Sequence, residues 1–213
     1  MKTDELISML ASGAVAVEPR GLERRYATAL GWGALGTMLL VVLWLGVRRD
    51  LLEAALLPMF WVKLAFPAVL LAGALLATMR LSRPGVRLAR APMLIAAPVV
   101  AIWLLALFVL LGAAPATRNP LLFGQTWSVC SMYIAAVSVP GFVALFWAMK
   151  GAAPTRPVLA GAAAGLLSGS LGALVYALHC PEMAAPFLGI WYLLGMLIPA
   201  ALGAVLGPRL LRW

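Results

Sequence analysis

The two cysteines of this 213-residue chain, Cys130 and Cys180, are the residues best suited to chemistry, and Cys180 lies in a His179-Cys180-Pro181-Glu182 box. Two thiols beside one imidazole form a soft nitrogen–sulfur set for copper or zinc-like ions, so Cys130, His179 and Cys180 are candidate metal ligands. In an oxidising compartment, two thiols can also pair with each other. The residues leave a plainer alternative open, in which each cysteine is a small buried hydrophobe and His179 caps a helix.

The elements that must position these thiols are six apolar stretches that fill most of the chain. Hydrophobic residues make up 64% of the sequence, charged residues only 11%, and the mean hydropathy is +1.03, which excludes an ordinary soluble domain. Each stretch is about long enough to cross a bilayer, at roughly 20 residues. Because backbone polar groups in hydrocarbon must be satisfied within a segment, the sequence predicts an all-α membrane protein, a six-helix transmembrane bundle. The expected spans are 27–47, 59–79, 92–113, 127–149, 157–178 and 187–207.

The distribution of positive charge predicts that both termini lie in the cytoplasm. Six spans put both ends on one side, and in this orientation twelve of the 16 Lys and Arg residues lie on the inner side. The other four are Arg48, Arg49, Lys63 and Arg118. We expect Lys63 to extend along its span to the headgroups. The thiols then share the outer face, with Cys130 about one turn inside the fourth span and Cys180 just past the fifth.

Several functional classes are disfavoured by what the sequence lacks. No ionisable residue falls near the middle of a span, as an ion-coupled carrier needs. The chain has one histidine and no HExxH, GxSxG or phosphate loop, so we expect no enzyme and no required cofactor. The net charge of +9 is not arranged as a basic stripe with aromatics, so we expect no direct nucleic-acid binding. The alternative kept open is a small inner-membrane metal transporter that captures an ion at His179 and Cys180.

Small residues recur at a four-residue spacing on the last two spans. Gly161, Gly165 and Gly169 form such a run on the fifth span, and Gly203 and Gly207 repeat the spacing on the sixth. Small residues on one face let helix backbones approach closely, so we interpret both runs as packing surfaces inside the bundle.

The segment before the first span, residues 1–26, is polar enough to stay in water and predicts a short amphipathic helix. Thr3 is a plausible N-cap, and acidic residues in the first turn suit the helix dipole. A helix this short is unstable alone, so it should fold by docking on a protein or on the membrane surface. Its acidic start and single lysine favour a protein partner. The expected contact residues are Asp4, Glu5, Leu6, Ile7, Met9 and Leu10.

Four segments carry a resemblance to a known family: the start MKTDELI, the loop APTRP at 153–157, the box ALHCPE at 177–182 and the end GPRLLRW at 207–213. They resemble the NrsF family, the membrane anti-sigma factors that restrain extracytoplasmic-function (ECF) sigma factors of the sigma-F type in proteobacteria. The resemblance implies a multi-pass protein of the bacterial inner membrane whose partners are the lipid bilayer and an ECF sigma factor, sequestered by the cytoplasmic N-terminal segment.

The same resemblance implies a role for the cysteines. Cys130 and Cys180 match two periplasm-facing thiols that the family needs for its response to heavy-metal or oxidative stress, with a soft metal ion as one kind of signal. The zinc-binding motif of common anti-sigma proteins is absent from this sequence.

Overall fold

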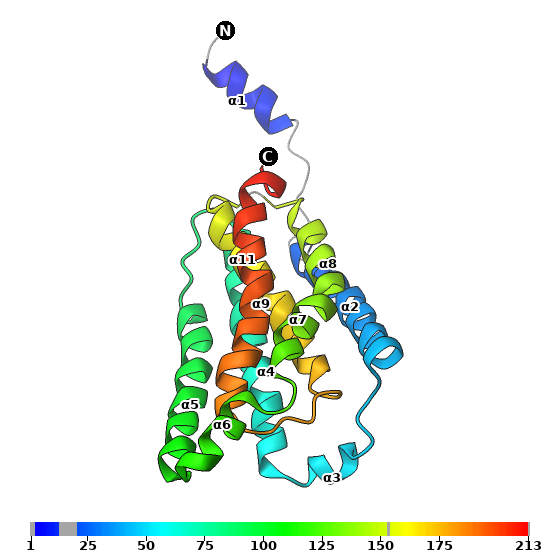
Figure 1. The fold of residues 1–213 in the computed structure, drawn as a ribbon. Helices are drawn as coiled ribbons and strands as arrows, with labels where there is room; N and C mark the ends of the chain where they lie inside the picture. Colours follow the sequence, from blue (N-terminus) through cyan, green and yellow to red (C-terminus); the bar gives the residue numbers. More distant parts are fainter. Residues whose placement is uncertain (1–2, 13–20, 153, 213) are drawn as a thin grey trace.

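The computed structural model describes residues 3–12, 21–152 and 154–212, and within them every regular element is helical (Figure 1). The predicted all-α fold with six membrane-spanning segments is confirmed. The six runs of helix that are long and apolar enough to cross a membrane are Gly21–Leu45, Pro58–Leu81, Ala91–Gly112, Pro115–Met149, Pro157–Tyr176 and Ala185–Leu210.

The helices follow one another in a simple order along the chain. They are α1 (Thr3–Ser12), α2 (Gly21–Leu40), the π-helix η1 (Val41–Leu45), α3 (Leu51–Ala55), α4 (Pro58–Leu81), α5 (Ala91–Gly112), α6 (Pro115–Phe123), α7 (Trp127–Val137), α8 (Val139–Met149), α9 (Pro157–Tyr176), α10 (Ala185–Phe187), the π-helix η2 (Leu188–Tyr192) and α11 (Leu193–Leu210).

Three features depart clearly from the expected spans, whose other ends agree with the structure within three residues. The first helix begins six residues early, at Gly21, so the expected domain boundary after residue 26 falls inside α2. A helix end does not mark the membrane edge, so that boundary stays a prediction. The fourth span is two helices, α7 and α8, which meet at Ser138 because Pro140 has no backbone N–H to donate. The additional helix α6 precedes it where a loop was expected.

Helix α9 lies at the centre of the bundle and packs directly on α11. A Cβ added to Gly161 would overlap the carbonyl oxygen of Gly203, and one added to Gly165 would overlap that of Pro199. These overlaps show that the two backbones are in contact. The predicted use of the glycine runs as packing surfaces is therefore confirmed, and α9 is the most buried of the spans.

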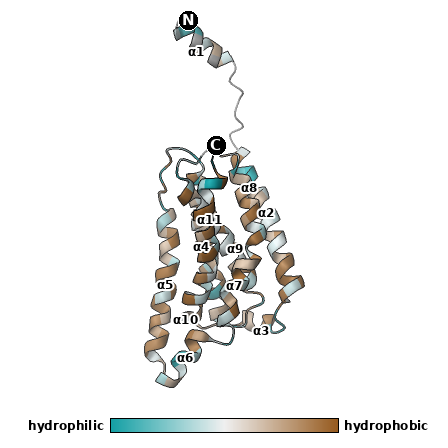
Figure 2. Cartoon of the chain, turned by 45° about the horizontal axis from the view of Figure 1, so that its top comes forward, coloured by the Kyte–Doolittle hydropathy of each residue, from teal (hydrophilic) through white to brown (hydrophobic). Residues whose placement is uncertain are grey.

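The core is divided between the two ends of the bundle. One cluster joins Tyr26, Leu81, Ala91 and Leu211, which places the start of α2 and the end of α11 at the same end. The other cluster joins the end of the first span to the α9–α10 loop and η2, and it contains both cysteines. Helix α5 stands at the edge of the bundle and turns an apolar surface outward (Figures 1 and 2).

Candidate functional site

The two cysteines meet at the end of the bundle opposite the start of α2. Cys130 lies in the first turn of α7, and Cys180 follows the turn that ends α9, where its N–H donates to the Tyr176 carbonyl at 3.1 Å. Both side chains are completely buried free thiols within hydrogen-bonding reach of each other. The fold thus brings together the two soft donors that the sequence separates, while their role as sensors stays a prediction.

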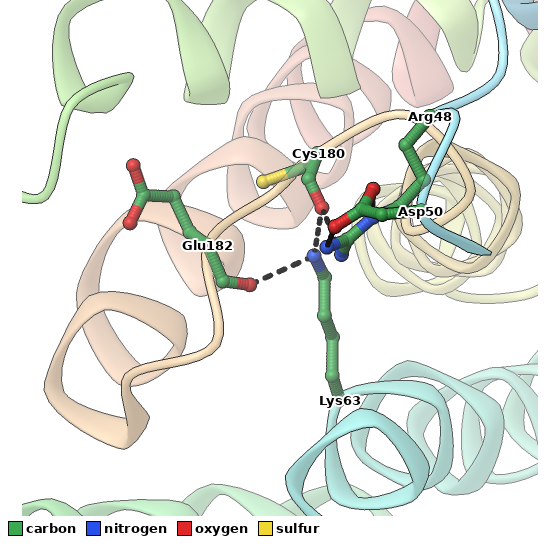
Figure 3. A network of polar contacts seen from close by, with 5 residues as sticks. All are labelled: Arg48, Asp50, Lys63, Cys180 and Glu182. Atoms are coloured by element: carbon green, nitrogen blue, oxygen red, sulfur yellow. Dashed lines mark hydrogen bonds and ion pairs between the residues drawn. The ribbon is translucent and has the colours of Figure 1, made fainter. Parts of the chain in front are cut away.

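Lys63 is the principal correction to the sequence-based expectation. We expected its side chain to reach the headgroups, but it is completely buried inside the bundle. Its ammonium group donates to the backbone oxygens of Cys180, at 2.5 Å, and Glu182, at 2.8 Å (Figure 3). The expectation was wrong because α4 packs on α9 and turns Lys63 toward the loop that carries Cys180, where two backbone carbonyl groups replace the headgroups.

Arg48 supplies a second cation to the same loop. Its Nη1 donates to the Cys180 oxygen at 3.3 Å, and its own backbone N–H donates to the Leu178 oxygen at 3.0 Å. Two further hydrogen bonds, at 2.8 and 2.6 Å, join its guanidinium to the Asp50 carboxylate (Figure 3). These bonds lower the pKa of Asp50 to about 2. The Arg48 side chain is only 8% exposed, so it is a fixed part of the site.

His179 connects the loop to the first span instead of joining the thiols. Its Nδ1 lies 2.8 Å from the carbonyl oxygen of Gly46, the residue that ends η1. No cluster of three or more His, Cys, Asp or Glu side chains suited to a metal occurs in the part of the chain that the structure describes. The trio Cys130, His179 and Cys180 is therefore not gathered as a three-residue metal site, and the two thiols remain as the paired soft donors.

Glu182 connects the loop to α7. Its Oε1 accepts hydrogen bonds from the backbone N–H groups of Gln125, at 2.6 Å, and Thr126, at 3.2 Å, immediately before that helix begins. A carboxylate at a helix N-terminus is favoured by both the free N–H groups and the helix dipole. One short loop therefore holds the start of α7, the first half of α4 and the end of the first span.

The surroundings of Cys180 favour its thiolate. The pKa of Cys180 is lowered to about 6, chiefly by a hydrogen bond from Cys130, with burial opposing the shift. The Lys63 ammonium, the Tyr192 hydroxyl and the Glu182 backbone amide lower it further. Within the described residues the buried Tyr192 hydroxyl has no conventional hydrogen-bond partner, so it is free to donate to a thiolate. An ionised thiol is the reactive and metal-binding form.

Two π-helical turns border this site. η1 ends the first span beside His179, and η2 begins the last span and carries Tyr192. In η2 the Gly189 carbonyl accepts from the Trp103 indole N–H at 3.0 Å, and the Trp191 carbonyl accepts from the Ser131 hydroxyl at 2.8 Å. A π-turn disturbs the regular helical ladder and frees such carbonyls, which is why these turns concentrate at functional sites.

The expected partner-binding residues lie on α1. Within this helix Asp4 and Glu5 are exposed in the first turn, and Ile7 and Met9 leave 58% and 64% of their surface exposed. The side chains of Leu6 and Leu10 lie outside the described part of the structure. The predicted helix is present, and its contact with a partner stays a prediction.

Sequence reasoning missed four residues of the cysteine site: Lys63, Arg48, Tyr176 and Tyr192. The signal for Lys63 was available, because an ionisable residue inside a span is more often functional than accidental. No sequence signal marks the tyrosines, whose aromatic character equally suits an interfacial anchor. Tyr176 lies beside Cys130, and its ring centroid is 5.9 Å from that of Tyr192.

The comparisons with known proteins agree with this architecture. A family described as a negative regulator of sigma F, NrsF, matches residues 10–213. The chain belongs to the NrsF family. It is 55% identical over the full length of both chains to a protein of Azospira oryzae named a probable anti-sigma-F factor NrsF. It is 41% identical, again over both full lengths, to the anti-sigma-F factor NrsF of Caulobacter vibrioides. No solved structure matches the chain.

Membership of the NrsF family makes this chain a negative regulator of sigma F by descent, which is a regulatory class. Its six apolar helices make it a multi-pass membrane protein. The family match begins at residue 10, so most of the α1 segment lies before it, although both relatives align with the whole chain.

Proposed function

We propose that this NrsF protein holds an ECF sigma factor at the bacterial inner membrane through its N-terminal segment. It releases the sigma factor when Cys130 and Cys180 react with a heavy metal or an oxidant. The observation that carries the proposal is the buried contact between the two thiols, beside a lysine and at the far end of the bundle from the start of α2. The end at which α2 begins and α11 ends is then cytoplasmic, and the thiol end faces the periplasm.

The tail provides the binding element. Helix α1 has ten residues, which is too short to be stable in water without a partner. Its exposed Ile7 and Met9 offer apolar anchors at the flanks of one face, as in a helix that docks in a groove. An acidic first turn would add charge complementarity to a basic surface on the sigma factor.

The thiols provide the sensing element. Oxidation would join the Cys180 thiolate to the Cys130 sulfur, with two electrons passing to the oxidant and the Cys130 thiol proton passing to water. A soft metal ion would instead bind both sulfurs as thiolates, because sulfur ligands favour soft ions. A disulfide removes the negative charge of the thiolate near Lys63. The buried ammonium group of Lys63 then loses a neighbouring opposite charge, which destabilises this arrangement. The loop around Cys180 must then rearrange.

The loop provides the connection between these elements. A shift of Cys180 disturbs its carbonyl bonds to Lys63 and Arg48 and the neighbouring bond from His179 to Gly46. Gly46 ends the first span, and the other end of that span leads to the N-terminal segment. A shift of the Cys180 loop is therefore passed directly to the first span. Coupling of about 1–3 kcal/mol between the two ends would change sigma-factor affinity by roughly 5–150-fold.

The test is co-purification of an ECF sigma factor from the same organism with the full-length protein in detergent. We expect sigma factor to bind the untreated protein and to be released by a soft metal or an oxidant. In the Cys130→Ser/Cys180→Ser protein it should stay bound under both treatments. Release from the serine variant would place the sensor elsewhere, and absence of binding in every state would refute the sequestration itself.

A tail variant separates sequestration from sensing. Ile7→Asp/Met9→Asp should abolish binding of the sigma factor, because both side chains are exposed and the charge would prevent their burial in a groove. Ser8→Asp/Ser12→Asp adds the same charge on the opposite face of α1, where both side chains are exposed, and should retain binding. Equal loss in both variants would show that added charge, and not the apolar face, is responsible. The metal-transporter alternative predicts unchanged transport in both tail variants.

A further inference from the structure

Two adjoining cavities lie at the end of the bundle where α2 begins, distant from the cysteines. The first is an apolar groove of about 360 Å³ between α4, α5 and α9, lined largely by alanine and leucine side chains. The second is a polar cleft of about 300 Å³ at the loop between α4 and α5. Leu81 and Leu88 line both, so the two cavities adjoin at these side chains.

The polar cleft is strongly cationic. Its lining includes Arg80, Arg83, Arg87 and Arg156. Arg83 lies 3.5 Å from the Glu23 carboxylate, and one Arg80 nitrogen donates to the Arg87 carbonyl at 2.9 Å. Within the described residues Arg87 and Arg156 have no carboxylate partner. Four like charges around one cleft repel one another, and a bound anion would relieve that repulsion.

The two cavities together match one kind of molecule. The groove lies between apolar spans, and the cleft lies just past the end of α4, where the apolar span ends and we expect the lipid headgroups. Guanidinium groups present paired donors that fit phosphate oxygens, and basic pockets between spans at the cytoplasmic side accept anionic lipid headgroups. We propose that this double cavity binds an anionic phospholipid, with its phosphate at the arginines and one acyl chain along the groove.

This lipid would join α5 to the bundle. α5 is the least buried of the spans and stands at the edge of the bundle (Figure 1). An acyl chain in the groove would contact α4, α5 and α9 at once. The inference does not depend on the proposed sensing by the cysteines.

The experiment is native mass spectrometry of the full-length protein in a neutral detergent, titrated with phosphatidylglycerol or with phosphatidylcholine of the same acyl chains. We expect tighter binding of phosphatidylglycerol. Arg87→Gln/Arg156→Gln should weaken it by about fivefold for each arginine removed. Both side chains are exposed, and the melting temperature verifies that the variant is folded. The control Arg90→Gln/Arg209→Gln removes the same charge outside the cleft and should leave the affinity unchanged.

The acyl-chain part of the site has its own variants. Ala96 lines the groove and is exposed, so Ala96→Phe should fill the groove and weaken phosphatidylglycerol binding. Ala72 is also exposed but lies outside the groove, and Ala72→Phe should bind normally.

Four outcomes would overturn the proposal. They are equal affinity for the two lipids, equal weakening by both arginine pairs, no effect of Ala96→Phe, and full competition by inorganic phosphate alone. A fifth outcome, loss of sigma-factor binding with unchanged lipid binding in the Arg87 and Arg156 variant, would also overturn it and would assign the cleft to an acidic protein segment.

Discussion

Removal of the Cys130 thiol should raise the pKa of Cys180, because Cys130 is its principal hydrogen-bond donor. A hydrogen bond to a charged group contributes about 1.5–3 kcal/mol, and the weak S–H donor places this one near the lower figure. At about 1.4 kcal/mol per pKa unit, Cys130→Ala should move the Cys180 pKa from about 6 to roughly 7. The fraction of Cys180 that is ionised near neutral pH should then fall.

The assay is alkylation of Cys180 by a small neutral reagent in detergent, followed by peptide mass spectrometry from pH 5 to 9. The rate rises as the thiolate forms, so the pH of half-maximal rate reports the pKa even though nucleophilicity falls slightly as the pKa falls. We expect a midpoint near pH 6 in the wild type and about one unit higher in Cys130→Ala. Cys130→Ser keeps a donor and should retain the low midpoint. Identical midpoints in the wild type and Cys130→Ala would refute the hydrogen-bonded pair.

Three further substitutions test the scaffold and the connection. Glu182→Ala should lower the free energy of unfolding by about 1–2 kcal/mol, because α7 loses its capping carboxylate, and a melting temperature equal to the wild type would contradict this. Gly165→Ala should lower the free energy of unfolding by about 1–3 kcal/mol, because the added Cβ would overlap an α11 carbonyl. Gly31→Ala meets no atom and should be neutral or slightly stabilising in the same thermal melts. His179→Phe keeps a ring beside α9 but loses the bond to the first span, so oxidation should no longer release the sigma factor in the co-purification assay; normal release would exclude this route.

The sequence by itself determined the architecture and the relation to NrsF. Hydropathy along the chain is a local property, and a bilayer demands about 20 apolar residues per span, so the number of spans follows without any knowledge of packing. The runs Gly161–Gly169 and Gly203–Gly207 likewise predicted a close helix pair, because small side chains every four residues lie on one helix face. The common face of the two cysteines followed from counting spans.

Only the tertiary structure decided how the site is built. Whether Cys130 touches Cys180 depends on the rotation and crossing of α7 and α9, which are fixed by contacts between helices distant in sequence. The packing of α4 on α9 turned Lys63 inward, where two loop carbonyls satisfy it, so a residue that hydropathy assigns to the headgroups became the cation beside a thiol. Sequence patterns report how far a residue lies along its helix axis. The direction in which its side chain points around that axis is set by packing, and in this protein that direction assembles the site.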